Sequence, residues 1–293
     1  GQLRPEVAQA WNMPQALVVG GGGDNAAGAV GVGMADAGQA MLSLGTSGVY
    51  FAVSEGFLSK PESAVHSFCH ALPGRWHLMS VMLSAASCLD WAAKLTGLAS
   101  VPALIAAAQS ADESAGPVWF LPYLSGERTP HNNPQAKGVF FGLTHQHGPA
   151  ELARAVLEGI AFETVSTYEP LAEYPQVTMP ASAVAIGGGT RNKLLMQIKS
   201  SLSGLPYHVL DAEEATALGA ALLGGVGAGV FANADEAIAA MRYGQSSVQP
   251  VPEDAAVYDR IKRQVYQHVY PAIAPLSQAI SDLQNALIDA DDQ

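Results

Sequence analysis

Two short apolar runs in this sequence each end in a cluster of glycines. Residues 16–19 lead into Gly20–Gly23, and residues 183–186 lead into Gly187–Gly189. A run of about four apolar residues that stops at glycine is typical of a buried strand ending in a tight loop. Segments of helical character follow both clusters, so strands alternate with helices along the chain. This order predicts an α/β fold with a mixed sheet.

The remaining segments extend the same pattern. Strands are expected at residues 41–44, 49–53, 67–72, 76–80, 118–121 and 207–210, and helices at 25–34, 84–95, 191–202 and 213–223. Pro149 begins a clearly amphipathic helix. Residues 124–148 are expected to form a long loop, and loops of that length are often functional. A long helix is predicted from Glu253 to about Leu287, with any break at Pro271.

The charge balance limits the partners of the chain. Its 293 residues include 14 Lys and Arg against 26 Asp and Glu, which gives a net charge of −12. Such a chain repels nucleic acid and anionic membranes, so neither is expected as a partner. An anionic small ligand is not excluded, because backbone N–H groups can hold phosphates without side-chain charge. With 49% hydrophobic residues, the chain can bury a sizeable core.

The cysteines and one apolar stretch indicate whether the protein is secreted, membrane-bound or cytoplasmic. Cys69 and Cys88 are too few for a disulfide framework, so both are expected to be reduced thiols of a cytoplasmic protein. Residues 215–234 form the longest apolar stretch without a charge, but they are mostly Gly and Ala. A buried helix leading into a glycine-rich loop explains this composition better than a membrane span does.

The first glycine cluster lies close to the start of the sequence. It begins at residue 20, and residue 1 is a glycine and not a methionine. A domain that builds a site this early usually follows another domain. We therefore expect residues 1–15 to be a linker and short helix from a missing N-terminal domain. Residues 16–293 are expected to form the C-terminal domain.

Asp24 and Asn25 follow the first glycine cluster directly. Glycines let the backbone approach a ligand with no Cβ atom in the way. A carboxylate at the end of a strand lies where open α/β sheets bind their ligands, and it can accept a proton from a hydroxyl. Asp24 is therefore a candidate general base. The alternative is that it only caps the helix that follows.

A glycine-bearing hairpin turn is predicted between the strands 41–44 and 49–53. Its residues Gly45, Thr46 and Ser47 would present several N–H groups and two hydroxyls to one point. This suits a polyphosphate, which needs hydrogen-bond donors more than it needs positive charge. An ordinary hairpin turn without a ligand is the alternative.

The cluster Gly187–Gly189 leads through Thr190 and Arg191 to Asn192. Glycines between a strand and a helix N-terminus can let an adenine or a ribose lie flat on bare backbone. Asn192 could then hydrogen-bond the base or cap the helix. A plain helix start is again the alternative.

Motifs of other phosphate and nucleotide enzymes are absent from the sequence. It has no G-x-x-x-x-G-K-[ST] loop, no G-x-G-x-x-G fingerprint, and no H-R-D, D-F-G or G-x-S-x-G motif. His145 and His147 form an H-x-H pair without a carboxylate–histidine spacing, so both are expected to be solvated loop residues. His66, His70 and His77 fall on a predicted hairpin, as packing or surface residues. We therefore predict that no side chain of this chain binds a metal ion.

Taken together, these loops resemble the FGGY family of carbohydrate kinases, which is built on the actin-like ATPase (ribonuclease H-like) fold. The family's C-terminal signature is matched by Gly138–Leu143, a seven-residue spacer and the acidic helix Glu151–Glu158. The Gly-Gly-Gly-Asp-Asn loop, the Ser43–Gly48 turn and the helix Glu214–Ala221 match in order and in spacing. The resemblance covers about residues 2–270. It implies an α/β domain with a mixed sheet flanked by helices.

The resemblance also implies a role for each candidate residue. Asp24 would be the base that takes the proton from a sugar hydroxyl, and Asn25 beside it would touch the sugar. The nucleotide side would consist of the phosphate-lining Gly45, Thr46 and Ser47, the adenosine-facing Gly188, Gly189 and Asn192, and Asp90 on the helix after the second hairpin. ATP is the implied phosphoryl donor. Mg²⁺ would be held mainly by its phosphates and by water.

The resemblance is closest to the D-xylulose-phosphorylating branch of the family, in residues 26–91 and 121–134. It implies phosphoryl transfer from ATP to D-xylulose, giving D-xylulose 5-phosphate. A kinase for gluconate, ribulose, fuculose or glycerol, and a non-catalytic actin-like ATP-binding module, are the alternatives. The family's N-terminal domain, with most of the sugar pocket, lies outside this sequence. It is therefore an implied partner, the isolated chain is expected to be inactive, and a homodimer is left open.

Overall fold

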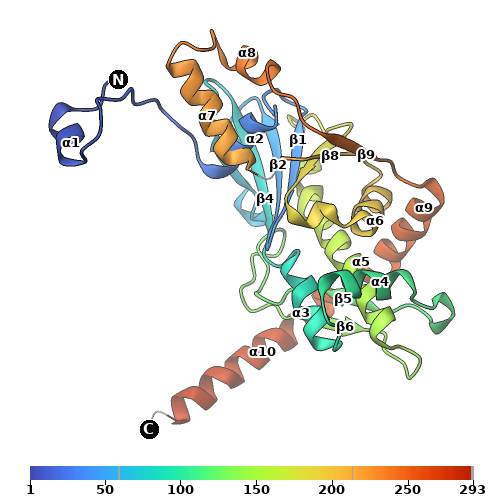
Figure 1. Cartoon of the computed structure of the whole chain (residues 1–293). Helices are drawn as coiled ribbons and strands as arrows, with labels where there is room; N and C mark the ends of the chain where they lie inside the picture. The colour runs from blue at the N-terminus through green and yellow to red at the C-terminus, as the bar shows by residue number, and fades with distance from the viewer. Residues whose placement is uncertain (59, 213, 292–293) are drawn as a thin grey trace.

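The computed structural model describes residues 1–58, 60–212 and 214–291. Its centre is a seven-stranded sheet with the order β3-β4-β2-β1-β7-β8-β9 (Figure 1). The strands are β1 (Ala40–Leu44), β2 (Gly48–Ser54), β3 (His66–Cys69), β4 (Trp76–Met82), β7 (Ala183–Ile186), β8 (Tyr207–Leu210) and β9 (Gln245–Val248). Strands β1, β7 and β8 are mutually parallel, and the other neighbours pair antiparallel. The predicted α/β class and mixed sheet are confirmed.

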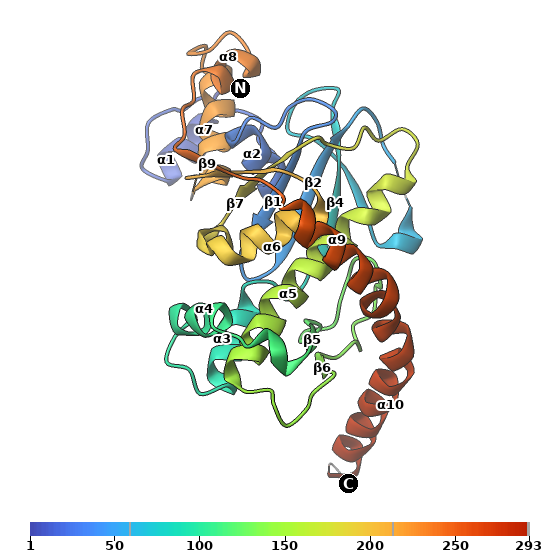
Figure 2. The same ribbon diagram turned by 90° about the vertical axis from the view of Figure 1, so that its right-hand side faces the viewer.

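Helices cover both faces of this sheet (Figures 1 and 2). The helices are α1 (Pro5–Ala10), α2 (Asp24–Gly31), α3 (Ser87–Leu95), α4 (Val101–Gln109), α5 (Pro149–Tyr168), α6 (Lys193–Ser203), α7 (Ala215–Gly227), α8 (Ala234–Ala239), α9 (Pro252–Ile261) and α10 (Gln267–Asp291). Helices α2 and α7 lie on one face, and α5 and α6 lie on the other. A small second sheet of β5 (Trp119–Leu121) and β6 (Val139–Phe141) packs against α5 below the main sheet.

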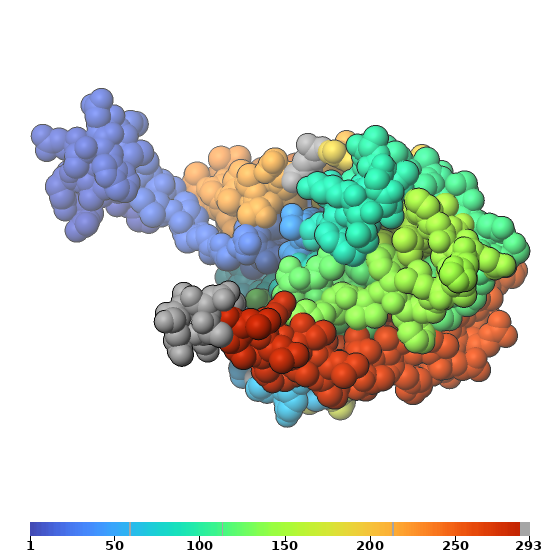
Figure 3. Space-filling view, turned by 90° about the horizontal axis from the view of Figure 1, so that it is seen from below, coloured from blue at the N-terminus to red at the C-terminus, as the bar shows by residue number. Residues whose placement is uncertain are grey.

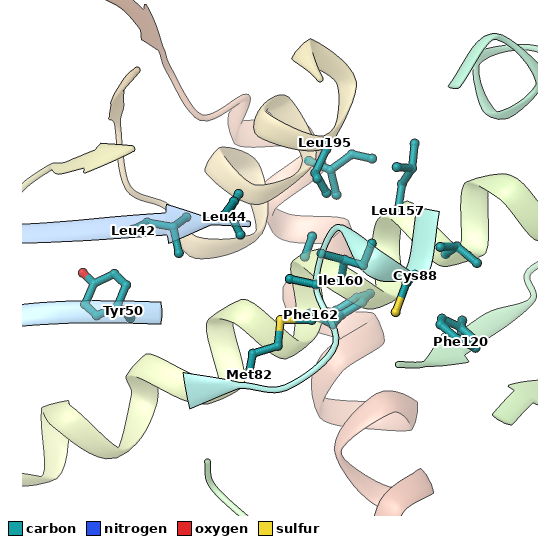
Figure 4. Packing of buried hydrophobic residues seen from close by; sticks show 14 of the residues in the cluster. Leu42, Leu44, Tyr50, Met82, Cys88, Phe120, Leu157, Ile160, Phe162 and Leu195 are labelled. Atoms are coloured by element: carbon teal, nitrogen blue, oxygen red, sulfur yellow. The ribbon is translucent and has the colours of Figure 1, made fainter. Parts of the chain in front are cut away.

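Alternation of side chains along β1 and β2 explains this two-sided cover. Leu42 and Leu44 lie in the large core cluster that contains α5 and α6, which Figure 4 shows around Ile160 and Leu195. Met41, which directly precedes Leu42, belongs to a second cluster with residues of α2 and α7. Successive side chains of a strand point to opposite faces, so an apolar residue at nearly every position demands cover on both sides.

Helices α2 and α7 pack so closely that only glycine fits at their contact. A Cβ atom at Gly219 would lie 1.8 Å from the carbonyl oxygen of Ala27. The Gly- and Ala-rich stretch 215–234 is therefore α7 and the segment after it, with one helix face packed on α2 and the other exposed. In the described part of the chain, no helix has the length and apolarity that a membrane crossing requires.

The carboxyl ends of β1, β7 and β8 lie at one edge of the sheet. Ser43 of β1 is in register with Ile186 of β7, and Ala185 of β7 is in register with Val209 of β8. The turn after β1 and the glycine loop after β7 therefore leave the sheet side by side. Open α/β sheets bind their ligands beyond such carboxyl ends.

The prediction of a buried strand at residues 16–19 was wrong. These residues lie in an extended N-terminal arm, where Leu17 is 44% and Val18 is 53% exposed. Within the described residues, the arm's β contact is an isolated bridge between Gln2 and Leu17. The predicted short helix before it is present as α1. An apolar run predicts a strand only if other strands pair with it, and the pattern of residues 16–19 does not show that the described residues offer no such strand.

Two further predictions need correction. The C-terminal helix is interrupted by a π-helical segment at Lys262–Tyr266, whereas Pro271 lies inside α10. Residues 124–148 are not one loop, because β6 within them pairs with β5. Helices α4 and α8 and strand β9 have no counterpart among the predicted elements.

Candidate functional site

The turn after β1 is held through its carbonyl groups and the Gly45 N–H, and it leaves the donors of Thr46 and Ser47 without a partner among the described residues. The carbonyl oxygens of Gly45 and Thr46 accept N–H bonds from residues 85–87 at the start of α3, at 2.9–3.3 Å. The Ser47 carbonyl accepts from the Gly45 N–H at 3.0 Å. Among the described residues, the N–H groups and hydroxyls of Thr46 and Ser47 donate to no acceptor. A turn fixed through its carbonyls, with outward donors beside a helix N-terminus, is suited to bind an anion.

The loop after β7 lies directly against this turn. Gly187 has φ +95°, and a Cβ atom there would lie 2.6 Å from the carbonyl oxygen of Leu44, the last residue of β1. Gly188 is exposed, and a Cβ atom there would meet nothing within 4 Å. The loop therefore presents bare backbone to solvent at the point where it is closest to β1.

A cavity of about 490 Å³ opens beside this loop and contains four of the predicted residues. Asp90, Gly188, Gly189 and Asn192 line it. The opposite wall is formed by residues of α4, namely Val101, Pro102, Ile105, Ala106 and Gln109. Its size and its mainly apolar lining with a few polar groups suit a small organic ligand.

Asn192 caps a helix with its side-chain oxygen and leaves its side-chain nitrogen without a partner among the described residues. Its side-chain oxygen accepts from the Leu195 N–H at 3.1 Å, which caps the N-terminus of α6. Its Nδ2 is buried and, among the described residues, has no hydrogen-bond partner. A buried donor without a partner costs about 1–3 kcal/mol. Because Asn192 lines the cavity, a ligand acceptor there would offset this cost.

A smaller cavity of about 280 Å³ lies on the other side of the same loop. It is lined by Gly188, Thr190 and Asp211, and by residues of β8 and of the segment that leads into β9. Asn192 does not line it. An adenine that accepts a hydrogen bond from Asn192 Nδ2 would therefore have to bind in the larger cavity.

Asp24 is the first residue of α2 and is exposed. Gly23 holds the N-cap position, so the alternative that Asp24 only caps this helix is wrong. One carboxylate oxygen accepts from the N–H of Asn25 at 2.8 Å and from its Nδ2 at 3.2 Å. The Thr216 hydroxyl of α7 donates to the Asp24 carbonyl at 3.2 Å, which fixes this helix end. No hydrogen bond joins Asp24 to the 45–47 turn within the described ranges, and Asp24 lines neither cavity.

Residues 40–228 match the family model described as the FGGY family of carbohydrate kinases, C-terminal domain. This chain belongs to the FGGY family. The matched span is more than half of the 293 residues and includes the 45–47 turn, the 187–189 loop and Asn192. The expected family is confirmed, and the actin-like ATPase fold of its members is confirmed with it.

Three similar FGGY proteins show how far the likeness extends. Over 224 residues the chain is 76% identical to a xylulose kinase of Klebsiella pneumoniae, covering 76% of this chain and 46% of that protein. Over 278 residues it is 62% identical to a xylulose kinase of Escherichia coli (strain K12), covering 94% and 56%. The crystal structure of a xyloylose kinase from Brucella ovis has a TM-score of 0.84 at 38% identity, covering 94% and 56%. The chain thus spans about half the length of the relatives it matches.

The α4 wall is the part of the larger cavity that the sequence patterns did not reveal. The start signals of α4 are present, since Ser100 caps it through a bond from the Ala103 N–H at 3.3 Å and Pro102 lies in its first turn. These signals predict a helix start but not which residues face a ligand. The position of Ile105 and Gln109 on the cavity depends on how α4 packs against α5.

Both cysteines are free, and one of the two loop histidines departs from the prediction of a solvated residue. Cys69 and Cys88 are free, and burial raises the pKa of the Cys88 thiol to about 12. His145 is an exposed loop residue, whereas a ring nitrogen of the partly buried His147 accepts from the Thr144 N–H at 2.9 Å. Over the described ranges, no group of three or more His, Cys, Asp and Glu side chains could hold a metal ion.

Proposed function

We propose that this chain is the nucleotide-binding and catalytic-base half of an ATP-dependent D-xylulose kinase. The proposal rests on its FGGY membership and on the names of the relatives at 76% and 62% identity, both xylulose kinases. In this proposal, residues 16–293 are the C-terminal domain, and residues 1–15 connect it to an N-terminal domain that supplies most of the sugar pocket. The enzyme is cytoplasmic.

The observation that carries the proposal is the pair of adjacent loops at the carboxyl ends of β1 and β7. Free N–H groups and hydroxyls at Thr46 and Ser47 fit phosphate oxygens. The cavity lined by Gly188, Gly189 and Asn192 lies next to them and fits an adenosine. ATP would lie across this edge, with Asp90 on the same cavity and the terminal phosphate at the turn.

The proposed reaction is direct transfer between two oxygens. The terminal hydroxyl of D-xylulose attacks the γ-phosphorus of ATP, its proton passes to the Asp24 carboxylate, and the bond to the β,γ-bridging oxygen breaks to release ADP. Asn25 is adjacent and would hydrogen-bond the sugar. Bound Mg²⁺ would neutralise phosphate charge and would be held mainly by the ATP phosphates and by water.

Within the described residues, Asp24 makes no hydrogen bond to the 45–47 turn, and in this proposal the sugar lies between them. The exposed carboxylate at the start of α2 is free to face a substrate held from outside the chain. Closure of an N-terminal domain over the sheet edge would bring the hydroxyl, Asp24 and the γ-phosphate together and exclude water. The isolated chain should therefore bind ADP and ATP weakly and phosphorylate sugar negligibly.

The test uses a full-length fusion protein. The part of the Escherichia coli relative that precedes its match with this chain is joined to Gly1. Sugar phosphate and ADP are measured with D-xylulose, ribulose, fuculose, gluconate and glycerol in parallel. We expect rapid ADP formation with D-xylulose and little with the others. A preference for another of these substrates would reassign the sugar. ADP formation that no sugar stimulates would favour the non-catalytic ATP-binding module.

A further inference from the structure

The side chain of Glu127 binds the chain at the point where strand β4 ends. Met82 is the last residue of β4, and the N–H group of the next residue, Leu83, donates to Glu127 Oε1 at 3.0 Å. The same oxygen accepts from the Arg128 N–H at 2.7 Å. A buried carboxyl group therefore holds the first residue beyond β4, where the strand pairing of the sheet has stopped.

Residues 85–87, just beyond Leu83, hold the 45–47 turn from behind. Their three N–H groups and the Ser87 hydroxyl donate to the carbonyl oxygens of Gly45 and Thr46 at 2.9–3.3 Å. A single buried residue separates Leu83 from this segment. The place at which Glu127 fixes Leu83 therefore sets where the support of the turn begins.

Glu127 is itself held firmly in its loop. Its backbone N–H and carbonyl exchange hydrogen bonds with Asn133 at 2.8–2.9 Å. Gly126 before it has φ +76°, and a Cβ atom there would lie 2.7 Å from the Pro134 carbonyl oxygen. Asn133 also donates through Nδ2 to the Tyr270 hydroxyl of α10 at 2.9 Å, and Figure 3 shows green segments of the chain packed against this red helix. Glu127 is only 1% exposed, so its carboxyl group acts from a fixed, buried position.

Glu163 of α5 is a second buried carboxyl group, and its pKa is affected by Glu127. One of its oxygens accepts from the Tyr123 hydroxyl at 2.7 Å. Its Oε1 and the Oε2 of Glu127 are buried and have no hydrogen-bond partner among the described residues. Burial raises the pKa of Glu127 to about 7, and burial followed by the charge of Glu127 raises the pKa of Glu163. A neutral Glu127 accepts at Oε1 and has a proton to donate at Oε2.

We propose that Glu127 is a positioning residue for the nucleotide phosphates, resting on the proposed function for the binding of ATP at the 45–47 turn. It lines neither cavity at this edge of the sheet, so it acts through Leu83 and residues 85–87. These residues hold the carbonyl groups of the turn and leave its N–H and hydroxyl donors facing outward. Donors that are fixed before the phosphate arrives bind it without a further loss of chain entropy.

The experiment compares two buried side chains that both bond to β4 or its end. Glu127→Met removes the acceptor of the Leu83 N–H. Thr129→Val is the matched control, because Thr129 Oγ1 accepts from the Val81 N–H at 3.1 Å, two residues before Leu83. Both variants should unfold at lower urea concentration than the parent 293-residue chain. The Kd for MgADP should rise about tenfold in Glu127→Met and stay within about twofold in Thr129→Val. An unchanged Kd in Glu127→Met, or an equal rise in both variants, would overturn the proposal.

Rescue by a neutral isostere is the second arm. Glu127→Gln keeps an acceptor for Leu83 and places an N–H donor at the position of Oε2, so it should retain the parent affinity for MgADP. A Kd raised as far as in Glu127→Met would overturn the proposed role of Oε1. If Glu127→Met does not fold, Glu127→Asp serves in its place, because it withdraws the carboxyl group from Leu83 by one methylene.

Amide hydrogen exchange without nucleotide separates this proposal from the proposed function. Exchange of the N–H groups of residues 85–87, which bond to the turn, should be about tenfold faster in Glu127→Met or Glu127→Asp than in the parent. It should be unchanged in Glu127→Gln and in Thr129→Val. Exchange that neither Glu127→Met nor Glu127→Asp alters would overturn the proposal. If exchange changes as expected in a chain that binds no MgADP, the proposed function fails and the support of the turn by Glu127 stands.

Discussion

The backbone of Gly187 lies against the carbonyl of Leu44, and no side chain fits between them. Gly187 has φ +95°, which side-chain-bearing residues rarely adopt, and a Cβ atom there would lie 2.6 Å from the Leu44 oxygen. Leu44 ends β1 and directly precedes the 45–47 turn. This one contact therefore sets the distance between the proposed phosphate turn and the proposed adenosine loop.

Substitution of Gly187 should lower the stability of the folded chain. We expect Gly187→Ala to lose about 2–3 kcal/mol of unfolding free energy, from backbone strain and from the clash with Leu44. Gly188→Ala is the matched control, because a Cβ atom there meets nothing within 4 Å. It should unfold like the parent chain in urea. Equal stability of the two variants would contradict this account of the loop.

Two substitutions of Asn192 should separate its helix-capping contribution to stability from its contribution to ligand binding. Asn192→Ser keeps a capping oxygen for the Leu195 N–H and removes the unpartnered Nδ2, so stability should stay within about 0.5 kcal/mol while ADP affinity falls about tenfold. Asn192→Ala removes the cap as well and should cost about 1 kcal/mol of stability. Calorimetry with MgADP and urea unfolding measure the two effects. Unchanged ADP affinity in Asn192→Ser would remove the proposed base contact.

His77 should make the folded chain less stable in mild acid. Burial lowers the pKa of His77 to about 4, with His70 nearby as a second cause, and its ring stacks on Phe51 at 4.2 Å. The unfolded chain binds this proton below about pH 6.5, whereas the folded chain binds it only below about pH 4. Stability is therefore lost as the pH falls from about 6.5 to 4, by on the order of 2 kcal/mol.

The measurement compares urea unfolding of the parent chain and of His77→Gln at pH 7 and at pH 4.5. Other titrating groups are common to both proteins, so the difference between their pH dependences belongs to His77. The variant should lose less stability between the two pH values. Identical losses would mean that His77 is not held neutral in the fold.

Local patterns predicted most of the sheet and the loops at its edge. Strands β1, β2, β7 and β8 and the glycine bends after β1 and β7 follow from short apolar runs bounded by glycine, and register then makes the bends neighbours. The same pattern failed at residues 16–19, because burial of an apolar run depends on a partner strand that the run itself does not specify. The π-helical segment 262–266 has no residue signature comparable to a proline, so the sequence predicts a break at Pro271 instead.

The sequence offers candidate site residues, but it does not show their arrangement. Gly188, Gly189, Asn192 and Asp90 share one cavity because α3 and the β7 loop meet there, a long-range contact that the sequence does not encode locally. Asn192 is the clearest case, since its capping bond was foreseeable and its unpartnered Nδ2 became visible only in three dimensions. Within the described residues, the bonds of Asp24 are to Asn25 and Thr216 and none reaches the 45–47 turn, so its distance from the phosphate would be set by a sugar held by the proposed N-terminal domain.

The role of Asp24 is therefore tested in the full-length kinase. Asp24→Asn keeps the size of the side chain and an oxygen for the Asn25 N–H, but it removes the proton acceptor. We expect kcat for D-xylulose phosphorylation to fall by about 10²–10⁴, with ADP affinity unchanged, because a base acts in transfer and not in nucleotide binding. Asp90→Asn makes the same change in the nucleotide cavity and should weaken ADP binding while largely sparing kcat. If Asp24→Asn keeps more than roughly a tenth of the parent kcat, Asp24 is not the base.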